Sequence, residues 1–177
     1  MRDGMLDLET WGLRVGSAIR SVAMVQFDPY SDRVGAKFYA NVTLESCQGI
    51  GLEVDPKTRD WWDKQSVEAQ SVLTKDPVPI GEAVSKLVAF WRMAGLTYPW
   101  SQGANFDQPL IEEIMRRLGV PIPWKFYDSA CTRTAYRMSG FNVFGVKRQG
   151  IPHYALDDCL HQIVCVQKSY SKLGLRN

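Results

Sequence analysis

The chain has 177 residues and a formal net charge of +2, with 45% apolar and 23% charged residues. This composition predicts one soluble globular domain over residues 1–177 and excludes a disordered chain. The small net charge does not by itself indicate a nucleic-acid partner. No apolar run reaches the roughly 18 residues of a membrane span, and the start has no stretch of signal-peptide length, so we expect a cytoplasmic protein with no membrane partner.

The first third of the chain predicts three antiparallel strands. A short apolar run at residues 5–9 and a longer one at 18–27 predict two strands of which the second is largely buried. Residues 28–32 have turn chemistry, and apolar residues then alternate with polar ones over 34–42. This pattern indicates a three-strand antiparallel meander.

Helical spacing follows. Short helices are predicted near residues 59–62 and 66–70, and longer amphipathic helices over about 81–93, 110–118 and 156–170. A further strand is predicted over 98–104. The predicted fold class is therefore α/β, a mixed sheet flanked by helices.

Three short motifs place acidic residues at the ends of these elements. Asp7 and Glu9 share one face of a strand, where their repulsion favours a cation between them. Asp107 follows a strand and begins a helix, and Asp158 lies in the first turn of the last helix, shortly after His153. Each motif also has an ordinary explanation: a solvated strand end, a helix N-cap, or acids favoured by the helix dipole.

The three motifs together, D-x-E, N-x-D and H-x-x-x-x-D, resemble those of the DEDDh exonucleases. The opening D-L-E-T-W-G and the segments 60–69 and 101–107 resemble the branch that contains phage exonuclease A and the small exonuclease-VIII-like and mycobacterial RNase-like enzymes. The resemblance extends from Leu6 to about Val166. It implies a ribonuclease-H-like fold, with an antiparallel meander plus parallel strands. The residues it implies for the active site are Asp7, Glu9, Asp107 and Asp158 as ligands of two divalent cations, Mg²⁺ or Mn²⁺, and His153 as general base.

The implied activity is two-metal-ion hydrolysis of a single-stranded 3′ end to nucleoside 5′-monophosphates, with DNA as the favoured substrate. An exoribonuclease is one alternative, because the cleaving residues do not discriminate between sugars. A non-catalytic nucleic-acid-binding module is another, which the presence of all five residues disfavours. A phage or prophage protein acting in a bacterial host is compatible with the resemblance, and a homodimer is left open.

Further residues are candidates for binding the substrate. The resemblance places backbone groups near Thr10 at the 3′ hydroxyl. Asn105 is a further candidate for contact with the substrate. The segment 145–152, just before His153, is expected to be mobile and to close on a 3′ end. His161 is expected to be a surface or capping residue. The candidates for stacking on bases are Trp11, Trp61, Trp62 and Phe106. One of Trp61 and Trp62 is expected in the core. The candidates for holding phosphates are Arg133, Arg137, Lys147 and Arg148, with a solvated basic face as the alternative.

Overall fold

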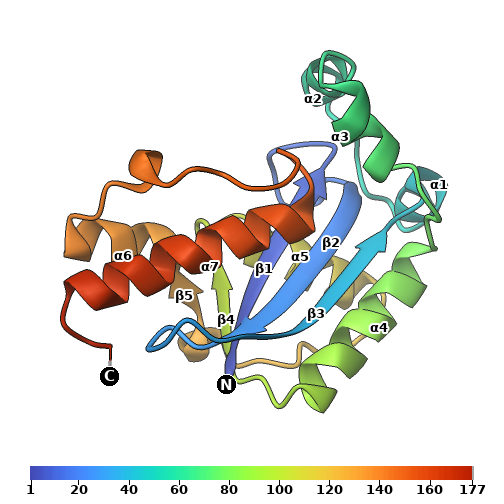
Figure 1. Ribbon diagram of the computed structural model, residues 1–177. Coiled ribbons are helices and arrows are strands. Elements are labelled where there is room, and N and C mark those ends of the chain that lie inside the picture. The colour runs from blue at the N-terminus through green and yellow to red at the C-terminus, as the bar shows by residue number, and fades with distance from the viewer. Residues whose placement is uncertain (177) are drawn as a thin grey trace.

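The computed structural model describes residues 1–176, which form a mixed sheet with helices on both faces (Figure 1). Its strand order is β3-β2-β1-β4-β5. β2 is antiparallel to both β1 and β3, whereas β4 is parallel to β1 and to β5. The strands are β1 (Asp3–Thr10), β2 (Ile19–Phe27), β3 (Val34–Asn41), β4 (Tyr98–Ser101) and β5 (Ala130–Cys131). The expected meander with added parallel strands is confirmed.

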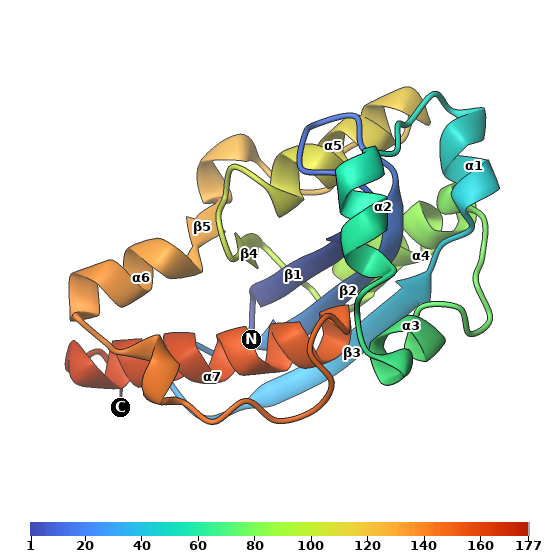
Figure 2. The same ribbon diagram turned by 90° about the horizontal axis from the view of Figure 1, so that it is seen from above.

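The helices α4 to α7 form two layers, one on each face of the sheet, whereas α2 and α3 lie beyond one end of it (Figures 1 and 2). One layer is built from α4 and α5, which pack on Leu6 and Leu8 of β1. The other contains α6 and α7, which pack on Met5 from the opposite face. The helices are α1 (Leu44–Gly49), α2 (Pro56–Trp62), α3 (Val67–Val72), α4 (Ile80–Met93), α5 (Asp107–Arg117), α6 (Thr132–Ser139) and α7 (Ala155–Lys172), with 3-10 turns η1 (Phe126–Asp128) and η2 (Val143–Gly145).

Side chains along β1 point alternately to the two faces of the sheet, and this alternation decides where Asp7 and Glu9 point. Side chains two apart on a strand share a face, so Asp7 and Glu9 lie on the same face as Met5, under α7. β1 is paired on both sides at its start, and its residues from Gly4 to Thr10 are buried. The strand is therefore a rigid support for the two carboxylates.

The strand β1 is longer than the predicted 5–9 and begins at Asp3. The polar residue Asp3 can begin the strand because its carboxylate accepts a hydrogen bond from Trp100 Nε1 (2.8 Å). Gly4 allows a close approach: a Cβ there would lie 2.9 Å from Leu96 Cδ1. These are long-range contacts, which the local pattern does not reveal.

Other boundaries also differ from those predicted. β4 ends at Ser101 rather than at 104, because residues 102–106 turn toward α5. The short elements α1, β5 and α6 were not predicted, since each has eight residues or fewer. Over residues 1–176, none of the helices combines the length and the apolar character needed to cross a membrane.

Candidate active site

Four carboxylates from three elements meet beside the end of β1. Asp7 and Glu9 come from the strand, Asp107 is the first residue of α5, and Asp158 lies in the first turn of α7. All four are at most 9% exposed. The Asp107 carboxylate accepts a hydrogen bond from the backbone N–H of Leu8 (3.3 Å), which ties the start of α5 to β1. The structure thus brings together all four acids that the resemblance implied.

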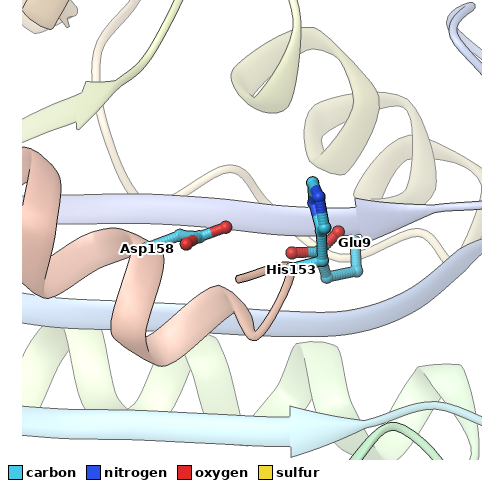
Figure 3. A group of neighbouring side chains, drawn as sticks. All are labelled: Glu9, His153 and Asp158. Atoms are coloured by element: carbon cyan, nitrogen blue, oxygen red, sulfur yellow. The ribbon is translucent and has the colours of Figure 1, made fainter. Parts of the chain in front are cut away.

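His153 completes this group. One possible ligand atom each from Glu9, His153 and Asp158 lie within 4.8 Å of one another. Figure 3 shows the imidazole next to the Glu9 carboxylate, while Asp158 reaches toward both from α7. A set of buried oxygen donors with one nitrogen nearby fits a hard divalent cation such as Mg²⁺ or Mn²⁺.

The electrostatics of the acids also fit a cation. Burial, followed by the charges of Asp107 and Glu9, raises the pKa of Asp7 well above its usual range. Burial and the charge of Asp107 raise the pKa of Glu9 to about 8. Burial likewise raises the pKa of Asp107 to about 7, although its hydrogen bond from Leu8 acts in the opposite direction. Without a cation, these groups resist being ionised together.

The imidazole of His153 is held by aromatic contacts from α2. Its ring lies edge-on to Trp61, with centroids 4.8 Å apart, and 6.0 Å from the ring of Trp62. Its backbone is left-handed (φ 62°), which is uncommon outside glycine. Partial burial, and then the charge of Arg148, lower the pKa of His153, so the ring is neutral and can accept a proton near pH 7.

Asp157, the acid next to Asp158, anchors the segment that carries His153. Its carboxylate accepts a hydrogen bond from the backbone N–H of Ile151 (2.8 Å). It also packs on Gly150 (φ 82°), where any Cβ would overlap the carboxylate. Asp157 therefore has a structural role that the sequence did not indicate.

A second residue not indicated by the sequence contacts the acids directly. Gln162, one helical turn after Asp158, donates a hydrogen bond from Nε2 to Asp7 Oδ1 (2.7 Å). Its side chain is 4% exposed. The i, i+4 spacing from Asp158 places both side chains on one face of α7, but it does not show that Gln162 contacts Asp7.

The chain matches the family model described as "3'-5' exoribonuclease Rv2179c-like domain" over residues 2–170. It belongs to this family. A related protein is the exodeoxyribonuclease of Enterobacteria phage T4, 26% identical over 137 residues, which cover 66% of this chain and 56% of that protein. The chain thus spans little more than half the length of this relative.

Solved exonuclease structures share the fold. The nuclease domain of 3′hExo, a DEDDh family member bound to rAMP, has a TM-score of 0.67 at 10% identity, covering 99% of this chain and 94% of that one. Exonuclease X in complex with 5′ overhanging duplex DNA has a TM-score of 0.59 at 15% identity, with coverages of 97% and 93%. Pop2p of S. pombe, in its Mg²⁺- and Mn²⁺-bound form, gives 0.62 at 10%, with coverages of 98% and 84%. At these identities the solved structures show the fold alone. With the family match, they confirm the resemblance to DEDDh exonucleases, the ribonuclease-H-like fold and the enzyme class.

Next to the acids of this exonuclease domain lies a pocket of about 480 Å³. Trp61 is 42% exposed, whereas Trp62 is 2% exposed and donates from Nε1 to the Thr10 carbonyl (2.8 Å). The expectation that one of these two tryptophans belongs to the core is confirmed. The residues lining the pocket are Leu8, Glu9, Thr10, Leu13, Asp55, Lys57, Thr58, Trp61, Trp62 and Phe106.

Trp11 and Asn105 lie outside this lining. The Arg20 guanidinium stacks between the rings of Trp11 and Trp62, 4.3 Å from each centroid. This contact covers one face of Trp11 and supports Trp62 from behind. Asn105 is exposed on the turn before α5.

The four basic candidates divide into two groups. Arg148 forms an ion pair with Asp158, and the charge of Arg133 reaches Asp107, where it lowers the pKa of that carboxyl. Arg137 is exposed one turn further along α6. Lys147 lines a separate groove of about 460 Å³ on the outer side of α7, together with His161 and Lys168. His161 thus lies apart from the acidic group, in agreement with the surface role expected for it.

Proposed function

We propose that this protein is a two-metal-ion 3′→5′ exonuclease. In this proposal Asp7, Glu9, Asp107 and Asp158 hold two divalent cations, Mg²⁺ or Mn²⁺, and His153 is the general base. The observation that carries the proposal is the convergence of four buried carboxylates beside an imidazole. The pKa values of Asp7, Glu9 and Asp107 are raised, and that of His153 is lowered. Such opposite shifts in one site are typical of acid–base and metal chemistry.

In this proposal the residues of the site have different roles in phosphodiester hydrolysis. The cations, when bound, supply the positive charge that phosphodiester hydrolysis requires at the attacked phosphate and at the departing 3′ oxygen. The neutral imidazole of His153 accepts the proton of the attacking water. Asp7 and Glu9, fixed on β1, hold their carboxylates without reorganisation, and the edge-on ring of Trp61 keeps the imidazole beside them.

The pocket beside Glu9 and Thr10 supports attack at a terminus. Its volume of about 480 Å³ suits one nucleotide, and its lining offers the partly exposed ring of Trp61 for stacking on a base. A 3′-terminal nucleotide seated there has its phosphodiester next to the carboxylates. The product would be a nucleoside 5′-monophosphate.

RNA is the substrate that the family description favours, and that match covers residues 2–170. DNA, the substrate favoured by the sequence, is the second candidate, supported by the name of the phage T4 relative. Three further points remain parts of the proposal. These are the preference for a single strand, the formation of a homodimer, and a cytoplasmic location in the bacterial host of a phage or prophage.

A degradation assay tests the proposal. Single-stranded RNA, single-stranded DNA and duplex DNA of one sequence, each labelled at the 5′ end, are incubated with Mg²⁺ or Mn²⁺. We expect a ladder that shortens from the 3′ end, release of nucleoside 5′-monophosphates, and no cleavage of strands with a blocked 3′ end. The matched control is Asp107→Asn, which should be inactive on all three. Efficient cleavage of circular single-stranded nucleic acid would identify an endonuclease instead.

A further inference from the structure

The contact between Gln162 and Asp7 is the one direct hydrogen bond from a neutral side chain to the acids of the site among residues 1–176. Gln162 sits on the face of α7 that covers β1, where its neighbours are apolar: Cys159 and Ile163 pack into the core with Met5. A buried amide in such a place is unfavourable unless its polar atoms are satisfied. Its Nε2 is satisfied by Asp7 Oδ1 at 2.7 Å.

We propose that Gln162 is a positioning residue that fixes the Asp7 carboxylate for metal binding. The inference rests on the proposed function, because it assumes that Asp7 is a ligand. A carboxylate accepts hydrogen bonds and donates none when ionised, so the amide must present its nitrogen to Asp7. The bond occupies Oδ1 and holds the plane of the carboxylate, which leaves Oδ2 for a cation.

The other end of the amide supports the same assignment. Gln162 Oε1 is buried and has no hydrogen-bond partner among residues 1–176. An acceptor in this position suits a water molecule of a cation's hydration shell, because Mg²⁺ keeps several waters when protein carboxylates bind it. Groups that hold a metal ligand in this way determine its orientation and its affinity for the metal.

The same helix offers a matched control. Gln167 is also 4% exposed, but its Nε2 donates to the backbone carbonyls of Asp28 (3.1 Å) and Arg33 (3.3 Å). It therefore ties α7 to the turn between β2 and β3, away from the acids. Replacing either glutamine removes a buried amide from α7, and Gln162 alone contacts an expected ligand.

The experiment compares Gln162→Met with Gln167→Met, because methionine has a similar length without a donor. Binding of Mn²⁺ to the metal-free protein is measured by isothermal titration calorimetry without nucleic acid. We expect Gln162→Met to bind Mn²⁺ about 10- to 100-fold more weakly, the usual effect of losing a group that orients a ligand. Gln167→Met should remain close to the wild-type protein, whatever its loss of thermal stability.

Kinetics provide a second reading. For Gln162→Met, the concentration of Mn²⁺ that gives half-maximal hydrolysis should rise by a similar factor, while kcat at saturating Mn²⁺ changes much less. Circular dichroism checks that the variant is folded. Gln162→Asn is the second variant: it keeps the amide but shortens the side chain by one methylene, and should also bind Mn²⁺ more weakly.

The outcomes are distinguishable. If the wild-type protein binds Mn²⁺, Asp7→Asn does not, and Gln162→Met binds like the wild type, the inference is wrong and the proposed function stands. Equal weakening in Gln162→Met and Gln167→Met, or two unfolded Gln162 variants, would also overturn it, because the amide would then be structural. A wild-type protein that binds no Mn²⁺ would overturn the proposed function, and the inference with it.

Discussion

The two halves of the active site are built in different ways. The four carboxylates stand on β1 and on the first turns of α5 and α7, with buried backbone on every side. His153 instead follows residues 140–152, which are mostly exposed and contain only the 3-10 turn η2. The acids therefore have fixed positions, while the imidazole depends on a few local contacts.

The difference indicates a division between a preformed acidic site and a base that is able to move. Segments with few buried contacts open at a lower free energy than the core does. The contacts of the His153 segment include the Arg148–Asp158 ion pair, the Ile151–Asp157 hydrogen bond and the edge of Trp61. Mobility of residues 145–152, and their closure on a 3′ end, remain predictions of this arrangement.

The largest expected effect comes from the rigid half. Asp107→Asn should abolish metal-dependent hydrolysis and at the same time raise the thermal midpoint of the metal-free protein, because one of several mutually repelling buried acids is removed. The same pair of changes is expected for Asp7→Asn and Glu9→Gln. Asp158→Asn should lose activity without a gain in stability, because it also removes the charged partner of Arg148. Cleavage assays and differential scanning calorimetry measure the two effects. Near wild-type turnover with Mg²⁺ in Asp107→Asn would show that this residue is not a ligand.

A smaller loss is expected in the movable half. His153→Ala should bind Mn²⁺ and nucleic acid normally but hydrolyse the bond roughly 10²–10⁴-fold more slowly, the usual contribution of a positioned base. The wild-type rate should fall at acid pH, where the imidazole becomes protonated, and this limb should flatten in the variant. Single-turnover cleavage between pH 5.5 and 9 with saturating Mn²⁺ measures both. An unchanged rate and acid limb would remove His153 from the mechanism.

The anchor of the movable half should contribute less again. Asp157→Ala leaves the Ile151 N–H without its partner, so we expect about a tenfold loss of kcat, which corresponds to the roughly 1.5 kcal/mol of a hydrogen bond to a charged group. Affinity for Mn²⁺ should not change. Limited proteolysis should cut residues 145–152 faster than in the wild type. Weakened Mn²⁺ binding in Asp157→Ala would show that the two halves are not separate.

The smallest effect is on stability and depends on pH. The pKa of Glu9 is raised to about 8 in the folded protein, so folding keeps a proton that the unfolded chain releases near its ordinary pKa. The metal-free protein should therefore lose stability as pH rises from about 5 to 8. We expect the thermal midpoint to fall by at least about 2–4 °C over this range, the equivalent of 1 kcal/mol in a domain of this size. Glu9→Gln, or saturating Mn²⁺, should reduce the slope; an equal slope in Glu9→Gln would assign the effect to other groups.

The same division explains what the sequence could predict. The i, i+2 spacing of Asp7 and Glu9 and the helix-start positions of Asp107 and Asp158 are local features. Each alone had an ordinary explanation, and only their combined resemblance to the DEDDh exonucleases implied one acidic group. Contacts between distant segments were missed. The bond from Gln162 to Asp7 joins residues 155 positions apart, so no local pattern contains it.

Two further contacts were missed for the same reason. The role of Asp157 depends on how Gly150 and Ile151 fold back on α7. The contact of Arg20 with Trp11 and Trp62 joins three separate segments, and Trp11 stays a candidate for stacking on bases. Residue type and spacing thus indicate the chemistry, whereas the supporting contacts depend on tertiary structure.

The edge-on contact between Trp61 and His153 allows the surroundings of His153 to be followed by intrinsic tryptophan fluorescence. Indole fluorescence responds to solvent and to quenching by a neighbouring imidazole, and Trp61 is both 42% exposed and 4.8 Å, centroid to centroid, from such a ring. The protein contains other tryptophans, so the signal is the difference in fluorescence emission between the wild-type protein and Trp61→Phe. This difference would report the surroundings of Trp61. Stopped-flow mixing with a 3′-ended strand would then follow changes around Trp61 and His153 in unlabelled protein.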